Sequence, residues 1–399
     1  MKRRFRISIL LLAGILLLGA GLAGLASVRS VMQYAFLPSA GSGTGMPGQE
    51  GETPKASAET GTSMLGFYDE SLKDMTASFP RLTLYGIKAG VTLGTEAGAK
   101  QGNVTVYAIG PSWYEVYPTR LRGGRPIVRP DMENRADVIM LDEKTAFRLF
   151  HSAETEGKTI LLGDEGEKKE YELVGAADHS RRIGETGEYA AWVPLDQLAD
   201  CDMMVAAAPV DEVNRFPVFE TQARTAFGSY GAGTAIDISK EKSRAMLPLL
   251  LVFTVLAIWL LKRWIRWLTG FAKERFLKVR AESKRRYTLP LLPYAAGQLL
   301  PVFLLFAATL AACYGVAVLA VSPMKVFPEW IPDALGEYDS WINRFWALAT
   351  DAARPVSLRT PELIEVQFYG NLILWGSLLI LLRAAKKTLA GFGRKDPQA

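Results

Sequence analysis

Long apolar runs set the first division of the chain. The run Ile7–Val28 contains no charged residue and follows the basic start Lys2-Arg3-Arg4-Phe5-Arg6. A cleaved signal peptide is the alternative, with small residues at Ala26-Ser27, but its apolar region spans only about 7–15 residues. Because a helix of about 20 apolar residues crosses a bilayer, we favour an uncleaved first span. Three more transmembrane helices are predicted from apolar runs at 246–261, 291–321 and 369–385.

Between the first two runs the pattern changes to short alternating segments. β-Branched and aromatic residues are bounded by Gly, Pro or Asp, as expected for strands. Gly163-Asp164-Glu165-Gly166 predicts a hairpin turn, and Asp142 is placed to cap a helix that carries Ala146 and Leu149. A mixed α/β domain follows from strands expected at Leu82–Tyr85, Val104–Ile109, Asp137–Leu141, Lys158–Leu162, Tyr171–Val174, Ala190–Val193 and Met203–Ala206.

Other segments fit neither pattern. Gly41–Ser63 is rich in Gly, Ser, Thr and Pro, which predicts a flexible linker. Val213–Phe227 has the pattern of a helix that is interrupted near Pro217. Residues 262–290 interleave ten basic residues with Trp, Phe and Leu, which predicts an amphipathic helix on the inner leaflet. Leu335–Ala349 has apolar residues at helical spacing and predicts an interfacial helix.

Charge is segregated along the chain. Segments 1–6, 262–290 and 383–399 hold 19 of the 46 Lys and Arg residues but only 3 of the 41 Asp and Glu residues. Each basic segment lies beside an apolar run, and such segments stay on the cytoplasmic side of a membrane. We therefore place both termini in the cytoplasm and the α/β domain outside the cell membrane. The same arrangement argues against nucleic acid as a partner of the basic segments.

The predicted fold class is an α-helical membrane protein with four transmembrane helices and a mixed α/β extracytoplasmic domain inserted between the first and second spans. The expected parts are the N-terminal basic segment and first transmembrane helix at 1–28, the flexible linker at 29–64, the extracytoplasmic domain at 65–245, the second transmembrane helix at 246–261, the cytoplasmic basic amphipathic segment at 262–290, the third transmembrane helix at 291–321, an extracytoplasmic loop with an interfacial helix at 322–368, the fourth transmembrane helix at 369–385 and a cytoplasmic tail at 386–399.

Motifs for chemistry are missing from the sequence. It has no G-x-x-x-x-G-K-[ST] loop, so it cannot power transport alone, and it has no H-E-x-x-H or G-x-S-x-G motif. Its two histidines, His151 and His179, have no neighbouring ligands at metal-site spacing. Cys201 lies in the α/β segment and Cys313 in an apolar run, so no disulfide is expected. We expect no enzyme activity, with no catalytic, cofactor-binding or metal-binding residues and no cofactor.

One formal motif match is false. Gly19-Ala20-Gly21-Leu22-Ala23-Gly24 fits the dinucleotide fingerprint G-x-G-x-x-G, but no strand precedes it and it lies within an apolar run. The small residues at Gly19/Ala23 and Ala20/Gly24 suit a face for close packing of another membrane helix. A lipid-facing surface without a partner is the alternative.

Six short stretches of the α/β segment resemble the extracytoplasmic core domain of the MacB/FtsX-type ABC transporter permeases. They are residues that shape the fold, not residues that do chemistry. The order of one span, a large outer domain and then three spans is also similar to that family. The stretches are Gly123-Gly124-Arg125, Val138–Leu141, Ala146 with Leu149-Phe150, Gly157-Lys158-Thr159-Ile160, Leu173-Val174-Gly175 and Trp192-Val193-Pro194.

This resemblance implies the permease subunit of an ABC transporter, with a separate ABC ATPase subunit bound at its inner face. A second permease protomer would form a homo- or heterodimer with it, in contact with membrane lipid. ATP-driven motion would reach the outer domain and serve export, extraction or partner activation. In that family the segment after the second span carries an E-I-x-x-L-R-A-L-G-like run, which Phe271–Lys278 echoes faintly.

The candidate ATPase-coupling residues lie in this inner segment. Trp264, Trp267 and Phe271 would hold a helix in the membrane interface, and Lys273, Glu274 and Arg275 would meet the ATPase. An interfacial helix whose basic residues face lipid is the alternative for this segment. A second class of function also stays open: a membrane-anchored extracytoplasmic scaffold or sensor with no ATPase partner.

Overall fold

The computed structural model contains two compact units. One is formed by Gly24–Lys242 with Arg354–Phe368, and the other by Met1–Ala23, Ser243–Ala353 and Tyr369–Ala399. The linker predicted at Gly41–Ser63 lies outside the described residues, as do seven of the fifteen residues of the helix predicted at Leu335–Ala349. Residues 338–340, 342–344 and 346 of that segment are described and are helical. The structure describes residues 2–37, 64–152, 156–163, 168–185, 187–198, 201–210, 215–228, 233–284, 288–326, 337–340, 342–344, 346 and 358–392.

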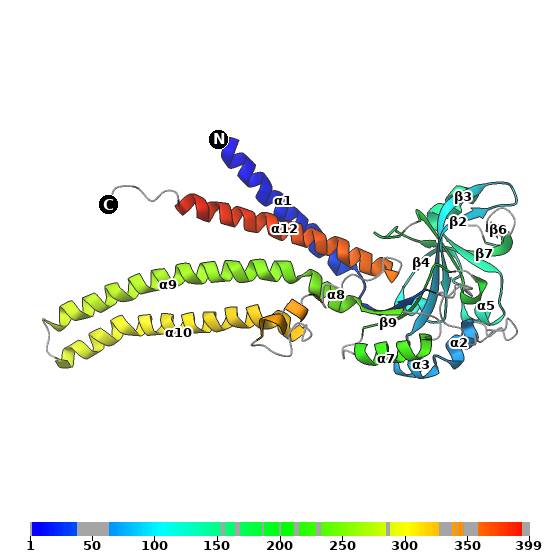
Figure 1. The fold of residues 1–399 in the computed structure, drawn as a ribbon. Coiled ribbons are helices and arrows are strands. Elements are labelled where there is room, and N and C mark those ends of the chain that lie inside the picture. The colour runs from blue at the N-terminus through cyan, green and yellow to red at the C-terminus, as the bar shows by residue number, and fades with distance from the viewer. Residues whose placement is uncertain are drawn as a thin grey trace. The chain divides into compact units, whose positions relative to one another are not determined.

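The first unit is built on one ten-stranded mixed sheet (Figure 1). Its strands lie in the order β10-β1-β9-β2-β3-β8-β5-β7-β4, and β6 pairs with β2 and β7. Among the described strands, β3 with β8 and β5 with β7 are the parallel pairs, and the others are antiparallel. The strands are β1 Val31–Phe36, β2 Thr83–Gly94, β3 Lys100–Ile109, β4 Arg120–Gly124, β5 Val138–Asp142, β6 Thr159–Leu162, β7 Lys169–Asp178, β8 Tyr189–Pro194, β9 Met203–Pro209 and β10 Gly233–Asp237.

The two faces of this sheet differ because side chains alternate along each strand. One face carries the apolar core, to which the helices α2, α3, α6 and α7 contribute, and Phe227 stacks on Phe36 there at 4.8 Å. The other face carries Gln33, Tyr85, Tyr107 and Trp192 at the intervening positions. The helices of this unit are α2 Met64–Glu70, α3 Lys73–Ser78, α4 Trp113–Val116, α5 Arg129–Glu133, α6 Glu143–Phe150, the 3-10 turn Leu195–Gln197, α7 Phe216–Phe227 and most of α8 Ile238–Ala245.

The local predictions for this domain are confirmed at most elements. Each of the seven predicted strands overlaps an observed one, and the predicted hairpin is the antiparallel pair β6–β7. The Asp142 carboxylate accepts a hydrogen bond from the backbone N–H of Thr145 at 3.1 Å, which is the expected N-cap of α6. The helix predicted from Val213 begins later, at Phe216, with Pro217 in its first turn rather than at a break inside it.

Strand β1 corrects the predicted domain boundary. It lies inside the segment 29–64 that the sequence assigns to a linker, yet all six of its residues are buried. It pairs with β10 on one side and β9 on the other. Its sequence shows no alternation of apolar and polar residues because both of its faces are covered. The α/β domain therefore includes β1, and a fragment that starts at residue 65 would lack an inner strand.

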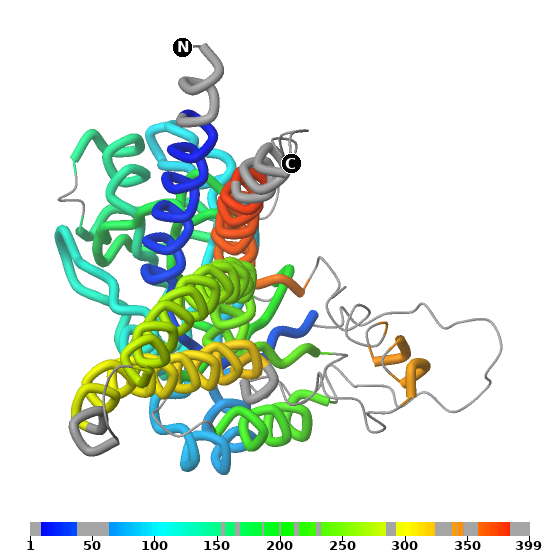
Figure 2. The backbone as a smooth tube through the Cα atoms, turned by 90° about the vertical axis from the view of Figure 1, so that its left-hand side faces the viewer, coloured from blue at the N-terminus to red at the C-terminus, as the bar shows by residue number. Residues whose placement is uncertain are grey.

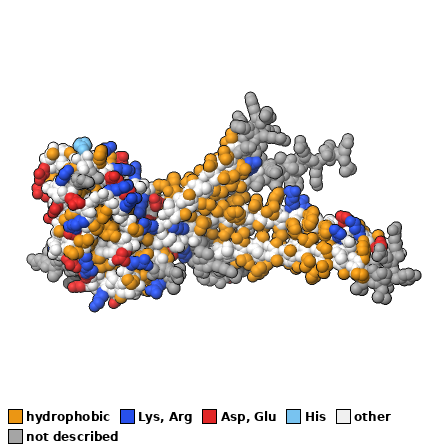
Figure 3. All heavy atoms as spheres, turned by 180° about the vertical axis from the view of Figure 1, so that it is seen from behind, with side chains coloured by type: hydrophobic (Ala, Val, Ile, Leu, Met, Phe, Trp, Pro, Cys, Tyr) orange, Lys and Arg blue, Asp and Glu red, His pale blue; other side chains and the backbone are white. Residues whose placement is uncertain are grey.

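The second unit consists mainly of long helices. Those with the length and apolar composition to cross a membrane lie, among the described residues, at Ile9–Ser27, Ile238–Ser283, Pro293–Pro323 and Pro361–Arg383. Hydrophobic side chains cover the surface of the long helices, whereas charged side chains gather on the α/β unit (Figure 3). This distribution is the one expected for helices that contact lipid. The helices are α1 Lys2–Ser27, α9 Leu247–Ser283, α10 Thr288–Val326 and α12 Pro361–Phe392.

Glycines bring α1 and α12 into close contact (Figures 1 and 2). A Cβ atom added to Gly376 would lie 2.9 Å from the carbonyl oxygen of Gly14, and one added to Gly21 would lie 3.0 Å from the carbonyl oxygen of Tyr369. Small residues that let helix backbones approach are a common basis of packing in membranes. Close packing thus occurs on α1, but at Gly14 and Gly21 and not at the predicted positions Gly19/Ala23 and Ala20/Gly24. Gly19 has open space around it, and Ala20 and Ala23 are exposed.

We expect Gly376→Val to destabilise the full-length protein in detergent by about 1–3 kcal/mol, since the added side chain must push the α1 backbone away. Gly19→Val is the matched control, because nothing lies within 4 Å of a Cβ at Gly19. Thermal unfolding followed by circular dichroism compares the two variants. Equal midpoints for both would contradict the glycine contact between α1 and α12.

Candidate functional site

Helix α9 carries all six candidate coupling residues, from Trp264 to Arg275. It runs without a break from Leu247 to Ser283, 37 residues, so it is about 55 Å long. The hydrocarbon core of a bilayer is only about 30 Å thick, and the helix therefore extends well beyond one face of it. The sequence predicts a separate interfacial helix after residue 261, but the described part of that segment continues the membrane helix in one piece.

Four of the predicted residues form a stack along one side of α9. The rings of Trp264 and Trp267 lie 5.1 Å apart, and those of Trp267 and Phe271 lie 5.5 Å apart and nearly parallel. The Arg275 guanidinium lies 4.9 Å from the centre of the Phe271 ring. Because these residues are three or four positions apart, each side chain reaches the next one on the same helix face.

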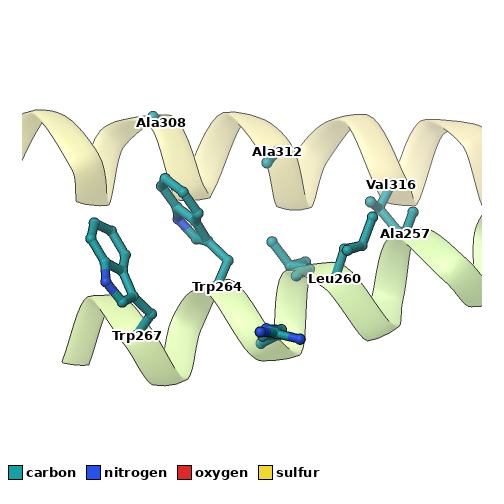
Figure 4. A pocket seen from close by; sticks show the side chains of 9 residues that line it. Ala257, Leu260, Trp264, Trp267, Ala308, Ala312 and Val316 are labelled. Atoms are coloured by element: carbon teal, nitrogen blue, oxygen red, sulfur yellow. The ribbon is translucent and has the colours of Figure 1, made fainter. Parts of the chain in front are cut away.

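This stack is fixed to the neighbouring helix α10 at two levels. The Trp264 Nε1–H donates to the hydroxyl of Thr309 at 3.0 Å, and Arg275 donates to the side-chain oxygen of Gln298. Figure 4 shows Leu260 and Trp264 extending from α9 towards α10. The stack thereby ties α9 and α10 into a helical hairpin.

The other two predicted residues do not join the stack. Lys273 and Glu274 are exposed, and Glu274 forms an ion pair with Lys278 of the next turn at 2.6 Å. An exposed pair of this kind adds only a few tenths of a kcal/mol to helix stability. Both side chains are thus accessible on the same helix that holds the stack.

A second polar site, which the sequence patterns do not predict, lies within the α/β unit around the first turn of α12. The Glu362 side chain is only 4% exposed and accepts hydrogen bonds from Arg182 at 2.8 Å and from Gln33 at 3.0 Å. The Gln33 side-chain oxygen in turn accepts from the Thr360 hydroxyl at 2.7 Å, and its nitrogen also donates to the Tyr117 hydroxyl. The first turn of α12 is therefore bonded directly to strand β1 and to the segment after β7.

Arg182 also belongs to a network with Glu185. The Glu185 carboxylate accepts from the Arg182 backbone N–H, from the Tyr107 hydroxyl at 2.9 Å and from the His179 ring at 3.0 Å. Burial by itself acts to raise the pKa of Glu185, but its hydrogen bonds with His179 and these other donors hold the pKa below the ordinary range. Burial acts to lower the pKa of Arg182, and the facing carboxylates of Glu362 and Glu185 raise it overall. Arg182 and Glu185 are thus both charged at neutral pH.

The surroundings of this network leave a cavity of about 200 Å³. Aromatic rings line it, with Trp113 and Tyr117 at 4.5 Å and Tyr85 and Trp113 at 4.9 Å between ring centres. His179 and Glu185 bond to each other here, but within the described residues no Ser, Cys or Thr nucleophile is bonded to the His179 ring. Within the described part of the chain, no cluster of three His, Cys, Asp or Glu residues is placed to hold a metal ion. The arrangement serves to fix the start of α12.

The sequence contains weak signals for this site. Gln33 is a polar residue within the apolar stretch Val31–Phe36, and Glu362 is an acidic residue just before a membrane-length helix. Each marks a position where a buried polar partner is required. The partners themselves are 329 and 180 positions away from Glu362, and no local pattern links them.

The four membrane-length helices and the mixed sheet define the class, a multi-pass membrane protein with a mixed α/β domain. Residues 7–216 match the family described as the MacB-like periplasmic core domain. The chain belongs to this family, and it is a MacB/FtsX-type permease with an extracytoplasmic core domain. Its family is one of transporter components rather than of enzymes.

Comparisons with individual proteins give shorter or more distant similarities. A macrolide export ATP-binding/permease protein MacB of Hahella chejuensis is 31% identical over 94 residues, which cover 23% of this chain and 14% of that protein. The periplasmic region of MacB from Actinobacillus actinomycetemcomitans is 12% identical with a TM-score of 0.37, covering 53% of this chain and 91% of that structure. The extracellular domain of the ABC-type transporter YknZ from Gram-positive bacteria is 15% identical with a TM-score of 0.36, covering 52% and 99%.

Proposed function

We propose that this chain is the membrane subunit of an ABC transporter that works with an ATPase on a separate chain. The observation that carries the proposal is helix α9, in which one unbroken element joins a membrane-length apolar run to the exposed Lys273 and Glu274. A force applied at these residues moves a rigid helix rather than a loop. The stack from Trp264 to Arg275 and its bonds to α10 support this role, because they bind the two helices into one hairpin.

In this proposal the α/β domain is inserted between the first and second spans and lies outside the membrane, with both termini inside. The positive-inside pattern of the three basic segments supports this orientation. The outer domain is attached to the membrane helices at three places in the chain: β1 directly follows α1, β10 leads through α8 to α9, and α12 begins with the bonded Glu362. Motion of the spans therefore reaches the domain through short, structured connections. A second permease protomer completes the assembly.

The first test is co-purification of an ABC ATPase with the native chain, extracted from its own membranes in detergent. We expect Glu274→Lys to reduce the retained ATPase about fivefold or more, because a central interface contact typically contributes more than about 1 kcal/mol. A repulsive charge at the contact adds to this loss. Mass spectrometry of the captured complex measures the ratio of ATPase to permease.

Lys278→Gln is the matched control, because it breaks the same ion pair while Glu274 stays in place. It should leave the ATPase ratio unchanged. Equal loss in both variants would mean that Glu274 only supports the helix. An ATPase missing from the native complex would reject the transporter proposal and favour a scaffold or sensor.

A further inference from the structure

A groove of about 720 Å³ runs between α9 and α10. Its volume is within the range of about 300–1,000 Å³ that is usual for ligand pockets. Leu260 and Trp264 form part of its wall, and small side chains on α10 leave it open (Figure 4). The lining residues are Ala257, Leu260, Leu261, Arg263, Trp264, Trp267, Ala308, Ala312 and Val316.

The groove has the length of one leaflet. From Ala257 to Trp267 it follows α9 for ten residues, which is about 15 Å at the rise of an α-helix. Half of a hydrocarbon core is also about 15 Å. Trp264 and Trp267 lie at one end of it, and tryptophan is enriched at the level of lipid headgroups. An acyl chain and its headgroup therefore match the groove in length and in polarity.

Cations without acidic neighbours lie at the same end. Arg263 lines the groove, and Lys262 and Arg266 lie within one turn of it on α9. None of these three side chains has a hydrogen-bond or ion-pair partner among the described residues. The sequence has no Asp or Glu from Leu247 to Lys273, and none in α10. A negatively charged ligand would meet uncompensated positive charge here.

We infer that the groove binds an anionic phospholipid of the inner leaflet, with an acyl chain between α9 and α10 and the phosphate at Arg263. Basic sites between membrane helices on the cytoplasmic side bind anionic headgroups by this chemistry. A second copy of the chain is the competing occupant. In a two-fold dimer whose axis lies along the membrane normal, a groove at the axis would face the same depth of the other copy, which would bring Lys262, Arg263 and Arg266 of both copies close together. Like charges in that position favour lipid over a second copy.

A neighbouring groove provides an internal comparison. It has about 650 Å³ and is lined by residues between Ser243 and Leu260 and by Leu319, Ser322 and Pro323 of α10. No cation is among its described lining residues. Apolar volume alone would make the two grooves equivalent, so a preference for anionic headgroups must come from the Arg263 end.

The test is native mass spectrometry of the full-length protein in detergent, with phosphatidylglycerol or phosphatidylcholine of the same acyl chains. We expect one phosphatidylglycerol molecule to be retained about tenfold more tightly than phosphatidylcholine. Arg263→Gln should reduce this preference about fivefold or more, and Arg263→Lys should keep most of it. Ala312→Leu, which fills the groove, should weaken the retention of both lipids.

Arg280→Gln is the matched control, since it removes one exposed cation further along α9, outside the groove. It should change the preference less than about twofold. Equal effects of Arg263→Gln and Arg280→Gln would overturn the site in favour of a summed surface charge. Unchanged lipid retention in Ala312→Leu, with altered dimerisation, would overturn it in favour of a second copy.

Discussion

Gly124→Ala is expected to destabilise the α/β domain of the full-length protein by about 2–5 kcal/mol. Gly124 has φ of +73°, and an alanine in the left-handed region costs about 1–2 kcal/mol. A Cβ atom here would also lie 2.2 Å from the carbonyl oxygen of Val174 in β7. Backbone cannot rotate away as a side chain can, so β4 must separate from β7, at a further cost of about 1–3 kcal/mol.

Gly90→Ala separates these two contributions. Gly90 also has φ of +73°, in an irregular part of β2, but nothing lies within 4 Å of a Cβ built there. This variant should lose only the conformational part, about 1–2 kcal/mol. Thermal unfolding of the purified full-length variants gives the comparison, with an expected difference of several degrees in the midpoint. If Gly90→Ala unfolds at the same temperature as Gly124→Ala, close contact between β4 and β7 is not what requires glycine.

The same contact explains why the sequence resemblance to the family holds at glycines. Gly123-Gly124 ends β4, Leu173-Val174-Gly175 lies in β7, and Gly124 pairs with Gly175 across the two strands. A Cβ atom on Gly175 would lie 2.5 Å from the carbonyl oxygen of Arg125. Such close approach of two backbones requires glycine at fixed positions. These glycines can therefore be recognised in the sequence before the fold is known.

Strands and caps of the domain could also be predicted, because they depend on neighbours in the chain. Asp142 caps α6 through Thr145, three residues away, and the antiparallel strands β6 and β7 are close neighbours in the sequence. Strand β1 could not be predicted from the sequence, because it is buried on both faces and its residues resemble the end of an apolar run. Its place in the sheet depends on β9 and β10, about 170 and 200 residues further along the chain.

The candidate sites divide in the same way. The stack on α9 follows helical spacing, so Trp264, Trp267 and Phe271 could be singled out from the sequence. Their bonding to Thr309 and Gln298 of α10 depends on tertiary structure. The site around Glu362 depends entirely on tertiary structure, because the residues that bond there come from β1, from the segment after β7 and from the residues before α12.

Arg182→Gln is expected to destabilise the protein more than Glu362→Gln, although both break the same ion pair. The Arg182 side chain is 33% exposed, whereas that of Glu362 is 4% exposed. Without Arg182, the buried carboxylate loses its ion pair and keeps its hydrogen bond from Gln33. Removing one partner of a buried pair costs about 3–5 kcal/mol, and we expect the lower end because Arg182 is partly solvated.

Glu362→Gln, by contrast, leaves no buried carboxylate without its partner. The amide oxygen of the new side chain can accept from Arg182, and the guanidinium can turn to water at its exposed edge. We expect a loss of about 1–2 kcal/mol, typical of a hydrogen bond to a charged group. For a unit of about 200 residues, these values correspond to midpoint shifts of roughly 6–12 °C for Arg182→Gln and 2–8 °C for Glu362→Gln.

The double variant Arg182→Met/Glu362→Met tests the physical reason for this order. Replacing both charges by apolar side chains removes the buried, unpaired carboxylate, so the double variant should be more stable than Arg182→Gln. Hydrogen exchange at β1 and at the first turn of α12 shows where stability is lost. Faster exchange at both elements in Arg182→Gln, with recovery in the double variant, is the result expected if the pair holds α12 to the sheet. A larger loss in Glu362→Gln than in Arg182→Gln would show that the carboxylate is not the group that needs compensation, and that α12 is held mainly by its apolar contacts.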